Sequence, residues 1–274
     1  MDLNTITAIV RPRRRAELPV WQAGDAWLAG GSWLFSEPQP SLTRLIDIVD
    51  FGWPALHITE QGLQIAATCK IAELDGTTYP SNWTATPLFN QCCRSFLASF
   101  KIWNMATVGG NLCMALPAGP MIALTAALHG TCTIWTPAGD ERRIAVTDFV
   151  LAPQRNALEP GELLRSIALP LSALHRRTAF RQISLAPLGR SAALLIGTLS
   201  PDDATFDLIV TASTPRPIRL LFPGPPTRDA LRERLETEIQ HYYDDVHGSP
   251  VWRRHMTLQF AEEIRQELAG EGFE

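Results

Sequence analysis

Two short segments each pair adjacent glycines with a hydroxyl side chain, a combination that suits phosphate binding. The first is residues 28–34 (Leu28, Ala29, Gly30, Gly31, Ser32, Trp33, Leu34), and the second is residues 106–112 (Ala106, Thr107, Val108, Gly109, Gly110, Asn111, Leu112). Glycine adopts backbone angles that other residues avoid, and its missing side chain lets amide N–H groups approach a phosphate closely. Two opposed segments of this kind could surround a diphosphate with neutral donors. A tight structural turn is the alternative interpretation of the first segment.

Neither glycine pair belongs to the common nucleotide-binding motifs. The dinucleotide fingerprint Gly-x-Gly-x-x-Gly and the Walker pattern that ends in Lys-Ser/Thr match neither segment. The six histidines are scattered, and none stands with a Ser or Cys nucleophile in a general catalytic pattern. The adjacent carboxylates of Asp244 and Asp245 are more typical of a turn entering a helix than of a metal site. Because neither glycine segment matches these common nucleotide-binding motifs, a Rossmann or P-loop site is disfavoured.

The sequence predicts strands and helices that alternate along the chain. These elements would position the two glycine segments. A change of pattern near residues 170–178 predicts a domain boundary, because β-compatible runs separated by turns follow one another beyond it. Before the boundary we expect strands at 44–48, 63–68 and 163–169, a helix within 87–100, and a hairpin of 131–135 with 143–146. After it we expect antiparallel strands at 179–183, 191–199 and 205–211, then two helices packed on them, the second capped by Ser249 with Pro250 in its first turn.

Composition excludes several classes of protein. The 274 residues are 46% hydrophobic and 19% charged, which allows a large buried core, and the net charge of -4 provides no basic surface for nucleic acid. The N-terminal residues do not resemble a secretory signal, and Pro117 and Pro120 interrupt the most apolar stretch. Five cysteines without metal-ligand spacing indicate reduced thiols rather than an iron–sulfur or zinc site. We therefore expect a cytoplasmic protein.

The two glycine segments, in this order, resemble those of the FAD-binding subunits and domains of the molybdenum hydroxylases, the xanthine dehydrogenase family. Residues 45–48, residues 101–104 and the Pro160-Gly161-Glu162-Leu163-Leu164 segment are also similar to that family. Near the C-terminus, residues 244–249 with 252–256 look like its helical signature. The resemblance covers nearly the whole chain.

This resemblance implies an α+β protein with two domains. Residues 1–172 would form a two-lobed FAD-binding domain of the vanillyl-alcohol-oxidase (PCMH-like) type, with α/β lobes at about 1–55 and 56–172. Residues 173–274 would form an antiparallel sheet with helices, similar to the C-terminal domain of CO dehydrogenase flavoproteins. The chain would hold FAD. An iron–sulfur small subunit with [2Fe-2S] clusters and a large subunit with the molybdenum–pterin cofactor would complete a heterotrimer or a dimer of heterotrimers.

The resemblance also assigns site residues and exposes departures. Trp33 stands where the family often has Asp, Pro120 where it usually has Asp, and Trp103 where it often has Arg. Lys101 and Arg181 are candidates that could equally be surface charges. No catalytic residue and no metal ligand is assigned; the predicted cofactor-binding residues are Leu28, Ala29, Gly30, Gly31, Ser32, Trp33, Leu34, Lys101, Ala106, Thr107, Gly109, Gly110, Asn111, Leu164 and Arg181.

Two other functions compete with an electron-transfer subunit that passes electrons from [2Fe-2S] clusters through FAD to an external acceptor. The first alternative is a subunit of the same kind of complex that has lost its flavin and has only a structural role. The departures at Trp33 and Pro120 are consistent with this alternative. A free-standing flavin oxidase is the third possibility, although no histidine motif for covalent flavin is present. The electron-transfer subunit is favoured.

Overall fold

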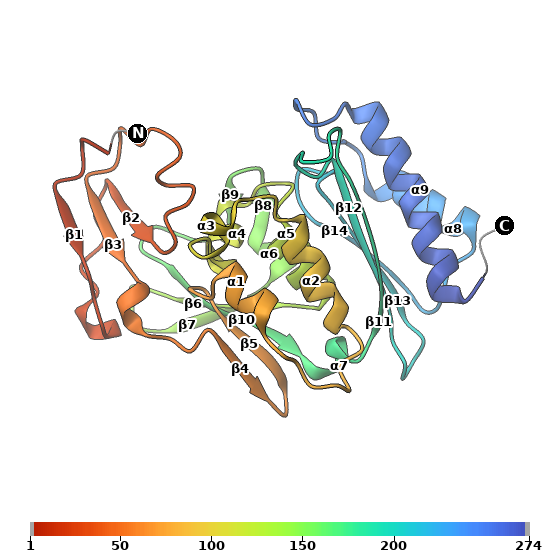
Figure 1. Ribbon diagram of the computed structural model, residues 1–274, viewed down its shortest axis with the longest axis horizontal. Helices are drawn as coiled ribbons and strands as arrows, with labels where there is room; N and C mark the ends of the chain where they lie inside the picture. The colour runs from red at the N-terminus through yellow and green to blue at the C-terminus, as the bar shows by residue number, and fades with distance from the viewer. Residues whose placement is uncertain (1–2, 272–274) are drawn as a thin grey trace.

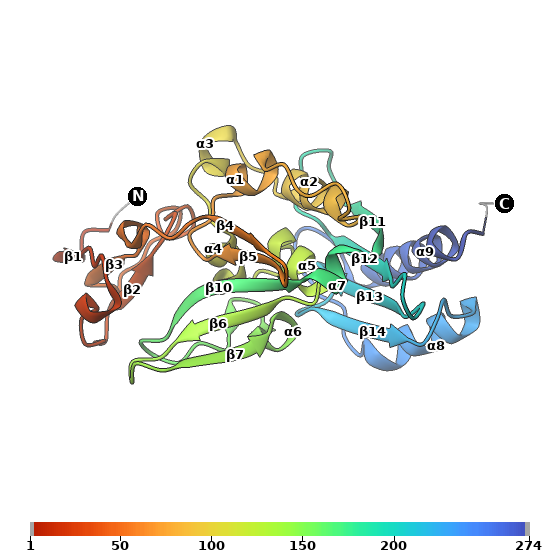
Figure 2. The same ribbon diagram turned by 90° about the horizontal axis from the view of Figure 1, so that it is seen from below.

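The computed structural model describes residues 3–271, which form three successive parts of an elongated molecule (Figure 1). A small sheet lies at one end, a five-stranded sheet with most of the helices lies in the middle, and a four-stranded sheet with two helices lies at the other end (Figure 2). The predicted α+β class is confirmed. No helix in residues 3–271 has the length and apolar character needed to cross a bilayer.

The N-terminal part is a three-stranded parallel sheet. Its strands are β1 (Ala8–Val10), β2 (Asp25–Leu28) and β3 (Arg44–Asp47), in the order β1-β3-β2. An ion pair of 2.6 Å between the half-buried Arg44 and the buried Asp25 joins the starts of β3 and β2. Between residues 3 and 55 the helical segments are the 3-10 turns η1 (Arg15–Glu17) and η2 (Val49–Phe51), so this lobe lacks the α-helices that were expected.

The middle part contains a five-stranded antiparallel sheet in the order β4-β5-β10-β6-β7. The predicted hairpin is confirmed as β6 (Thr131–Trp135) and β7 (Glu141–Ala145), and the strand after it as β10 (Leu163–Pro170). The helix expected at 87–100 ends at Ser95, because Phe96 leaves the helical conformation with ψ 82°. The remaining elements are β4 (Leu56–Thr59), β5 (Gly62–Ala66), α1 (Ile71–Gly76), α2 (Thr86–Ser95), α3 (Phe100–Trp103), α4 (Val108–Met114), α5 (Pro120–Ala127), α6 (Val146–Phe149), β8 (Val150–Ala152) and β9 (Arg155–Asn156).

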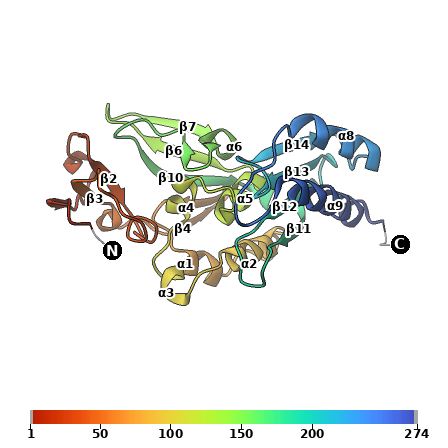
Figure 3. The ribbon, with the colours of Figure 1, turned by 90° about the horizontal axis from the view of Figure 1, so that it is seen from above.

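The C-terminal part is a four-stranded antiparallel sheet covered by helices (Figure 3). After α7 (Leu171–Leu174), the three predicted strands are β11 (Arg177–Ile183), β12 (Ala193–Leu199) and β13 (Phe206–Thr211). A fourth, β14 (Ile218–Phe222), was not predicted. The two predicted helices are α8 (Arg228–Glu238) and α9 (Pro250–Ala269), and the side chain of Ser249 accepts from the Trp252 amide as the expected cap.

Helix α5 packs between the middle part and the C-terminal sheet. All eight of its residues are buried, so it has no solvent-facing side. One continuous core joins Leu124 of this helix with Leu194, Ile196 and Ile209 of the C-terminal sheet. Strands β12 and β13 are therefore covered on both faces, by α5 on one face and by α8 and α9 together on the other.

Candidate functional site

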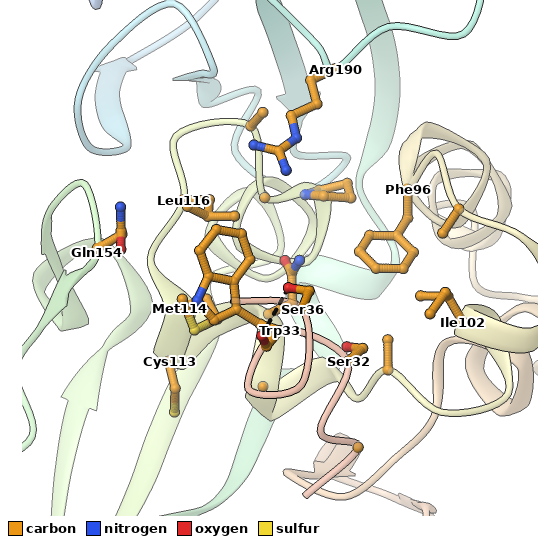
Figure 4. A pocket seen from close by; sticks show the side chains of 18 of the residues that line it. Ser32, Trp33, Ser36, Phe96, Ile102, Cys113, Met114, Leu116, Gln154 and Arg190 are labelled. Atoms are coloured by element: carbon orange, nitrogen blue, oxygen red, sulfur yellow. Dashed lines mark hydrogen bonds between the residues drawn. The ribbon is translucent and has the colours of Figure 1, made fainter. Parts of the chain in front are cut away.

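A cavity of about 910 Å³ lies where the three parts meet, and both glycine segments line it. Its size is at the upper end of the range for pockets that hold small molecules and cofactors, roughly 300–1,000 Å³. Figure 4 shows the contributions: Trp33 and Ser32 enter from the N-terminal part, Met114 and Leu116 from the middle part, and Arg190 from the C-terminal part. The site is therefore a product of tertiary packing rather than of one local motif.

The first glycine segment forms a compact turn whose amides are available. Gly31 has φ +66°, a left-handed conformation that favours glycine. The Phe35 amide donates to the Gly31 carbonyl at 2.8 Å, and both the amide and the hydroxyl of Ser36 donate to the Trp33 carbonyl at 2.8 Å. Within residues 3–271, the amides of residues 30–34 donate to no protein acceptor. This turn thus offers a row of unused N–H donors beside the cavity.

Gly30 brings the first glycine segment against the residues that precede α4. A Cβ atom on Gly30 would lie 1.8 Å from the Met105 carbonyl oxygen, well inside van der Waals contact. The neighbouring Ala106 lines the cavity from the other side of this contact. Gly30 is therefore required for the close approach of two backbone segments, a role that the sequence did not reveal.

The second glycine pair lies in a helix rather than in a loop. Thr107 is the N-cap of α4, and its hydroxyl accepts from the Gly110 amide at 3.0 Å. Gly109 and Gly110 therefore occupy the first helical turn. The two glycines have different surroundings: a Cβ on Gly109 would lie 2.5 Å from the Ala67 Cβ, whereas one on Gly110 would meet only the Thr107 Oγ1, at 2.9 Å. Gly109 allows α4 to pack on the chain after β5, and Gly110 faces the cavity.

Asn111 supports the start of α5. Its side-chain oxygen accepts from the Met121 amide at 3.1 Å, which fixes the carboxamide beside the cavity. Pro120, the residue that replaces the expected Asp, occupies the first turn of α5, where its missing N–H costs no helical hydrogen bond. Pro120 also lines the cavity, so the wall at this point is apolar rather than acidic.

The wall from the C-terminal part is anchored by Arg253. This side chain is 1% exposed, and its guanidinium donates to the carbonyls of Gly248, Ala192 and Ala212. It also forms an ion pair of 2.5 Å with Asp245. Burial lowers the pKa of Arg253, and the nearby Asp245 opposes that effect. Asp245 is thus the counter-ion of a buried arginine, which explains the carboxylate without a metal.

Arg190 is a charged residue of the cavity that sequence reasoning missed. It lies in the connection between β11 and β12 and is exposed. No ion pair or hydrogen bond to its guanidinium is found within the described part of the chain, residues 3–271. The signal in the sequence was weak, because a single Arg after Pro187, Leu188 and Gly189 looks like an ordinary surface loop. Tyr243 and His247 also line the cavity; His247 lies within the 244–249 segment noted for its family resemblance, and Tyr243 directly precedes that segment.

The structure brings ten of the fifteen predicted residues to the cavity and places five elsewhere. Arg181 forms ion pairs of 2.7 Å with Glu263 and 2.9 Å with Glu267 on α9, so its charge is used within the C-terminal part. Leu164 is buried in the hydrophobic core, and Lys101 is exposed on α3. Residues at the cavity are Ala29, Gly30, Gly31, Ser32, Trp33, Leu34, Ala106, Thr107, Gly110 and Asn111; those not lining it are Leu28, Lys101, Gly109, Leu164 and Arg181.

Thiol and metal chemistry have little support at this cavity. Cys113 lines it, but burial raises the pKa of this thiol to about 12, so it stays protonated. The residues that the structure describes contain no group of three or more His, Cys, Asp or Glu side chains able to hold a metal ion. What the arrangement can do is bind: it combines free amides, apolar walls and a cation in one large cavity.

Comparison with protein families places this chain beside known proteins. A family model described as the FAD binding domain in molybdopterin dehydrogenase matches residues 22–172, a range that contains both glycine segments. The match ends just beyond β10, at the start of α7.

Curated relatives are distant and mostly longer than this chain. The chain is 32% identical over 116 residues to the caffeine dehydrogenase subunit beta of a Pseudomonas strain, which covers 40% of the chain and 38% of that protein. It is 26% identical over 198 residues to the carbon monoxide dehydrogenase medium chain of Afipia carboxidovorans, covering 69% and 67%. It is 29% identical over 126 residues to xanthine dehydrogenase of rice, where the match spans 43% of the chain but only 9% of the relative.

Solved structures share the fold along the whole chain. A reconstituted CO dehydrogenase from Oligotropha carboxidovorans has a chain that aligns with a TM-score of 0.84 at 20% identity, covering 99% of this chain and 100% of that one. Quinoline 2-oxidoreductase from Pseudomonas putida 86 has a chain that aligns with a TM-score of 0.75 at 21% identity, covering 98% and 96%. At such identities the likeness shows a common fold.

Proposed function

The chain belongs to the family of FAD-binding domains of molybdopterin dehydrogenases, and from this membership we propose that it is the FAD-holding, electron-transferring subunit of a heteromeric molybdenum hydroxylase. The observation that carries the proposal is the position of the two glycine segments. They lie inside the matched range of 22–172, and they line one cavity of about 910 Å³. A family match and a suitable cavity thus fall on the same residues.

The lining of the cavity fits a dinucleotide with a diphosphate. The unused amides of residues 30–34 would donate to phosphate oxygens, and Gly110 leaves open space where a side chain would obstruct the ligand. The apolar walls of Met114, Leu116 and Pro120 suit the aromatic parts of such a ligand. These residues bind and orient the cofactor and exclude water from it. Bound FAD would itself supply an acceptor for electrons that arrive one at a time.

The proposed partner subunits are inferred from the names of similar proteins. The names of two relatives, a subunit beta and a medium chain, describe parts of larger dehydrogenases. We therefore propose an iron–sulfur partner that delivers electrons from [2Fe-2S] clusters, a molybdopterin-binding partner that oxidises the substrate, and an external acceptor that leaves the flavin oxidised. A heterotrimer or its dimer, located in the cytoplasm, is the assembly that we propose.

The first test is the absorbance spectrum of the purified chain. We expect visible flavin bands and the release of FAD on denaturation in about equimolar amount with the protein. A chain that remains colourless after incubation with FAD would contradict the proposal and support the flavin-free structural subunit.

A second test addresses the direction of electron flow. The iron–sulfur partner, reduced and free of excess reductant, should bleach the flavin of this chain when the two are mixed without oxygen. Turnover of an organic substrate by the isolated chain would instead support a free-standing flavin oxidase.

A further inference from the structure

Two side chains of the cavity, the half-buried Trp33 and the exposed Arg190, have no hydrogen-bond partner within residues 3–271. The indole of Trp33 donates to no acceptor in residues 3–271, unlike the indoles of Trp27, Trp103 and Trp135, which each donate to an oxygen at 2.8–3.0 Å. Nor does Trp33 pack against another aromatic ring or a cation within that range. Four of the remaining tryptophans, Trp21, Trp53, Trp83 and Trp252, likewise have no indole hydrogen bond, so what distinguishes Trp33 is its place at the cavity. A large ring projecting into a cavity in this way suits a surface that a ligand covers.

The position of Trp33 is imposed by its own turn. The three hydrogen bonds from residues 35 and 36 hold the backbone on either side of it. The ring of Phe35 closes the turn from behind, because it would lie 2.4 Å from a Cβ atom on Gly31. The indole therefore has nowhere to pack behind the turn, and it points into the cavity from the N-terminal part (Figure 4).

Arg190 enters the same cavity from the C-terminal part. In Figure 4 its guanidinium points inward, toward the region that the indole occupies. The other arginine of the cavity, Arg253, is held by Asp245 and three carbonyls, so its charge is already compensated. Of the acidic residues that line the cavity, Asp245 is thus occupied, and Glu37 is exposed on the N-terminal part without an ion pair to Arg190. Arg190 is the available cation.

The chemistry of the two side chains defines what fits between them. An indole face and a guanidinium plane both stack on flat aromatic rings. The guanidinium donates hydrogen bonds and accepts none, so the ring beside it should carry acceptors at its edge. The pyrimidine end of an isoalloxazine carries two carbonyl oxygens and the unprotonated N1 as acceptors, beside the N3–H donor, and it takes up negative charge when the ring is reduced. Adenine has no carbonyl oxygen and takes up no such charge, so it suits a guanidinium less well.

We propose that Trp33 and Arg190 form a slot that receives the isoalloxazine ring of the cofactor, with Trp33 stacked on the ring and Arg190 beside its pyrimidine end. This inference rests on the proposed function, because it requires bound FAD. The positive charge at that end stabilises negative charge on the reduced ring, so Arg190 is a positioning residue that also makes the flavin easier to reduce. Trp33, a departure from the family pattern, thereby becomes part of the binding surface.

The test of Trp33 is the fluorescence of the bound flavin in Trp33→Phe. Tryptophan stacked on isoalloxazine quenches its emission by electron donation, whereas phenylalanine keeps a ring of similar width and does not donate an electron. We expect quenched emission in the wild type and emission several-fold higher per bound FAD in the variant. The matched control is Trp103→Phe, since Trp103 does not line the cavity and should not change the emission. Equal emission from wild type and Trp33→Phe would overturn the slot.

The test of Arg190 is the affinity of the bound flavin for sulfite, which adds to the oxidised ring and places a negative charge on its pyrimidine end. We expect Arg190→Gln to raise the sulfite dissociation constant about tenfold, corresponding to ~1.4 kcal/mol of lost charge interaction, and to make the flavin midpoint potential more negative. Lys101→Gln removes a cation that lies outside the cavity and serves as the control. An unchanged sulfite affinity and potential in Arg190→Gln would overturn the role of this residue.

Failure of the slot and failure of the proposed function give different results. If the wild-type chain remains colourless with FAD, both are wrong. If the wild type binds FAD and the Trp33 and Arg190 variants behave like their controls, the chain is a flavoprotein and only the slot is wrong.

Discussion

The two glycine pairs look alike in sequence, yet the structure uses them differently. Gly30 and Gly31 lie in an irregular turn, where one permits a backbone contact with Met105 and the other adopts φ +66°. Gly109 and Gly110 lie in the first turn of a helix, where one packs on Ala67 and the other faces the cavity. The first pair supplies free amides, whereas the second supplies close packing and open space.

This difference shows that a glycine pair beside a ligand need not contact the ligand twice. In each pair, one glycine is needed because a side chain there would collide with another part of the protein. This requirement holds whether or not a phosphate is bound. Substitutions can separate the two roles, since a packing glycine affects the free energy of unfolding and a cavity glycine affects the affinity for FAD.

Gly30→Val should have the largest effect. Its Cβ atom would overlap the Met105 carbonyl, so the turn and the segment before α4 must separate. We expect a loss of more than ~3 kcal/mol in the free energy of unfolding together with loss of FAD, measured by denaturant unfolding and flavin content. Gly76→Ala is the control, because a Cβ there meets nothing within 4 Å. A Gly30→Val protein of wild-type stability would show that this contact is not needed.

Gly109→Ala should cost about 1–3 kcal/mol of stability, because an added methyl group would press on Ala67 in a well-packed region. The folded fraction should still bind FAD in nearly normal amount. Thermal unfolding with and without FAD measures both quantities. Normal stability with loss of FAD would reverse the assignment and place this glycine at the cofactor.

Thr107→Val should cost about 1 kcal/mol, since it removes the hydroxyl that caps α4 while keeping the shape of the side chain. Urea unfolding of the variant measures this loss. The Gly110 amide then loses its partner and becomes available beside the cavity. The loss of binding free energy for FAD should therefore be smaller than the loss in the free energy of unfolding. A stable variant with abolished FAD binding would indicate direct contact between the hydroxyl and the cofactor.

Gly110→Leu should change stability least, by less than about 1 kcal/mol, because the gain from replacing a helical glycine offsets a minor contact with Thr107. It should nevertheless abolish FAD binding, since the side chain extends into the cavity. Isothermal titration with FAD on the folded variant measures the affinity. Retention of full affinity would remove Gly110 from the site.

Much of the fold could be predicted from local patterns. The hairpin around Gly139 and the helix that begins at Pro250 were correct because turn residues and an N-cap mark them directly. Strand β14 was missed because prolines flank it on both sides, and prolines usually indicate a loop. These prolines lie outside the strand, and the five residues between them, Ile218–Phe222, are free to pair with β13.

The site was predictable only in part. The glycine segments were found because their composition is unusual, but sequence could not tell which face each glycine turns to the cavity. Arg181 was predicted from the family resemblance, as a basic residue after Phe180, and the structure shows that α9 supplies the carboxylates that bind it. That pairing depends on which helix packs on which strand, and no pattern within a single segment encodes that.

The complete burial of α5 limits how this protein can be divided. A fragment that stopped near residue 172 would keep both glycine segments, but it would remove Leu194, Ile196 and Ile209 from the side of α5 that they cover. The exposed apolar surface would favour aggregation of such a fragment. The FAD-binding half of this chain is therefore not an independent module, and a chimaera made by exchanging C-terminal domains would need a sheet whose inner face is matched to this helix.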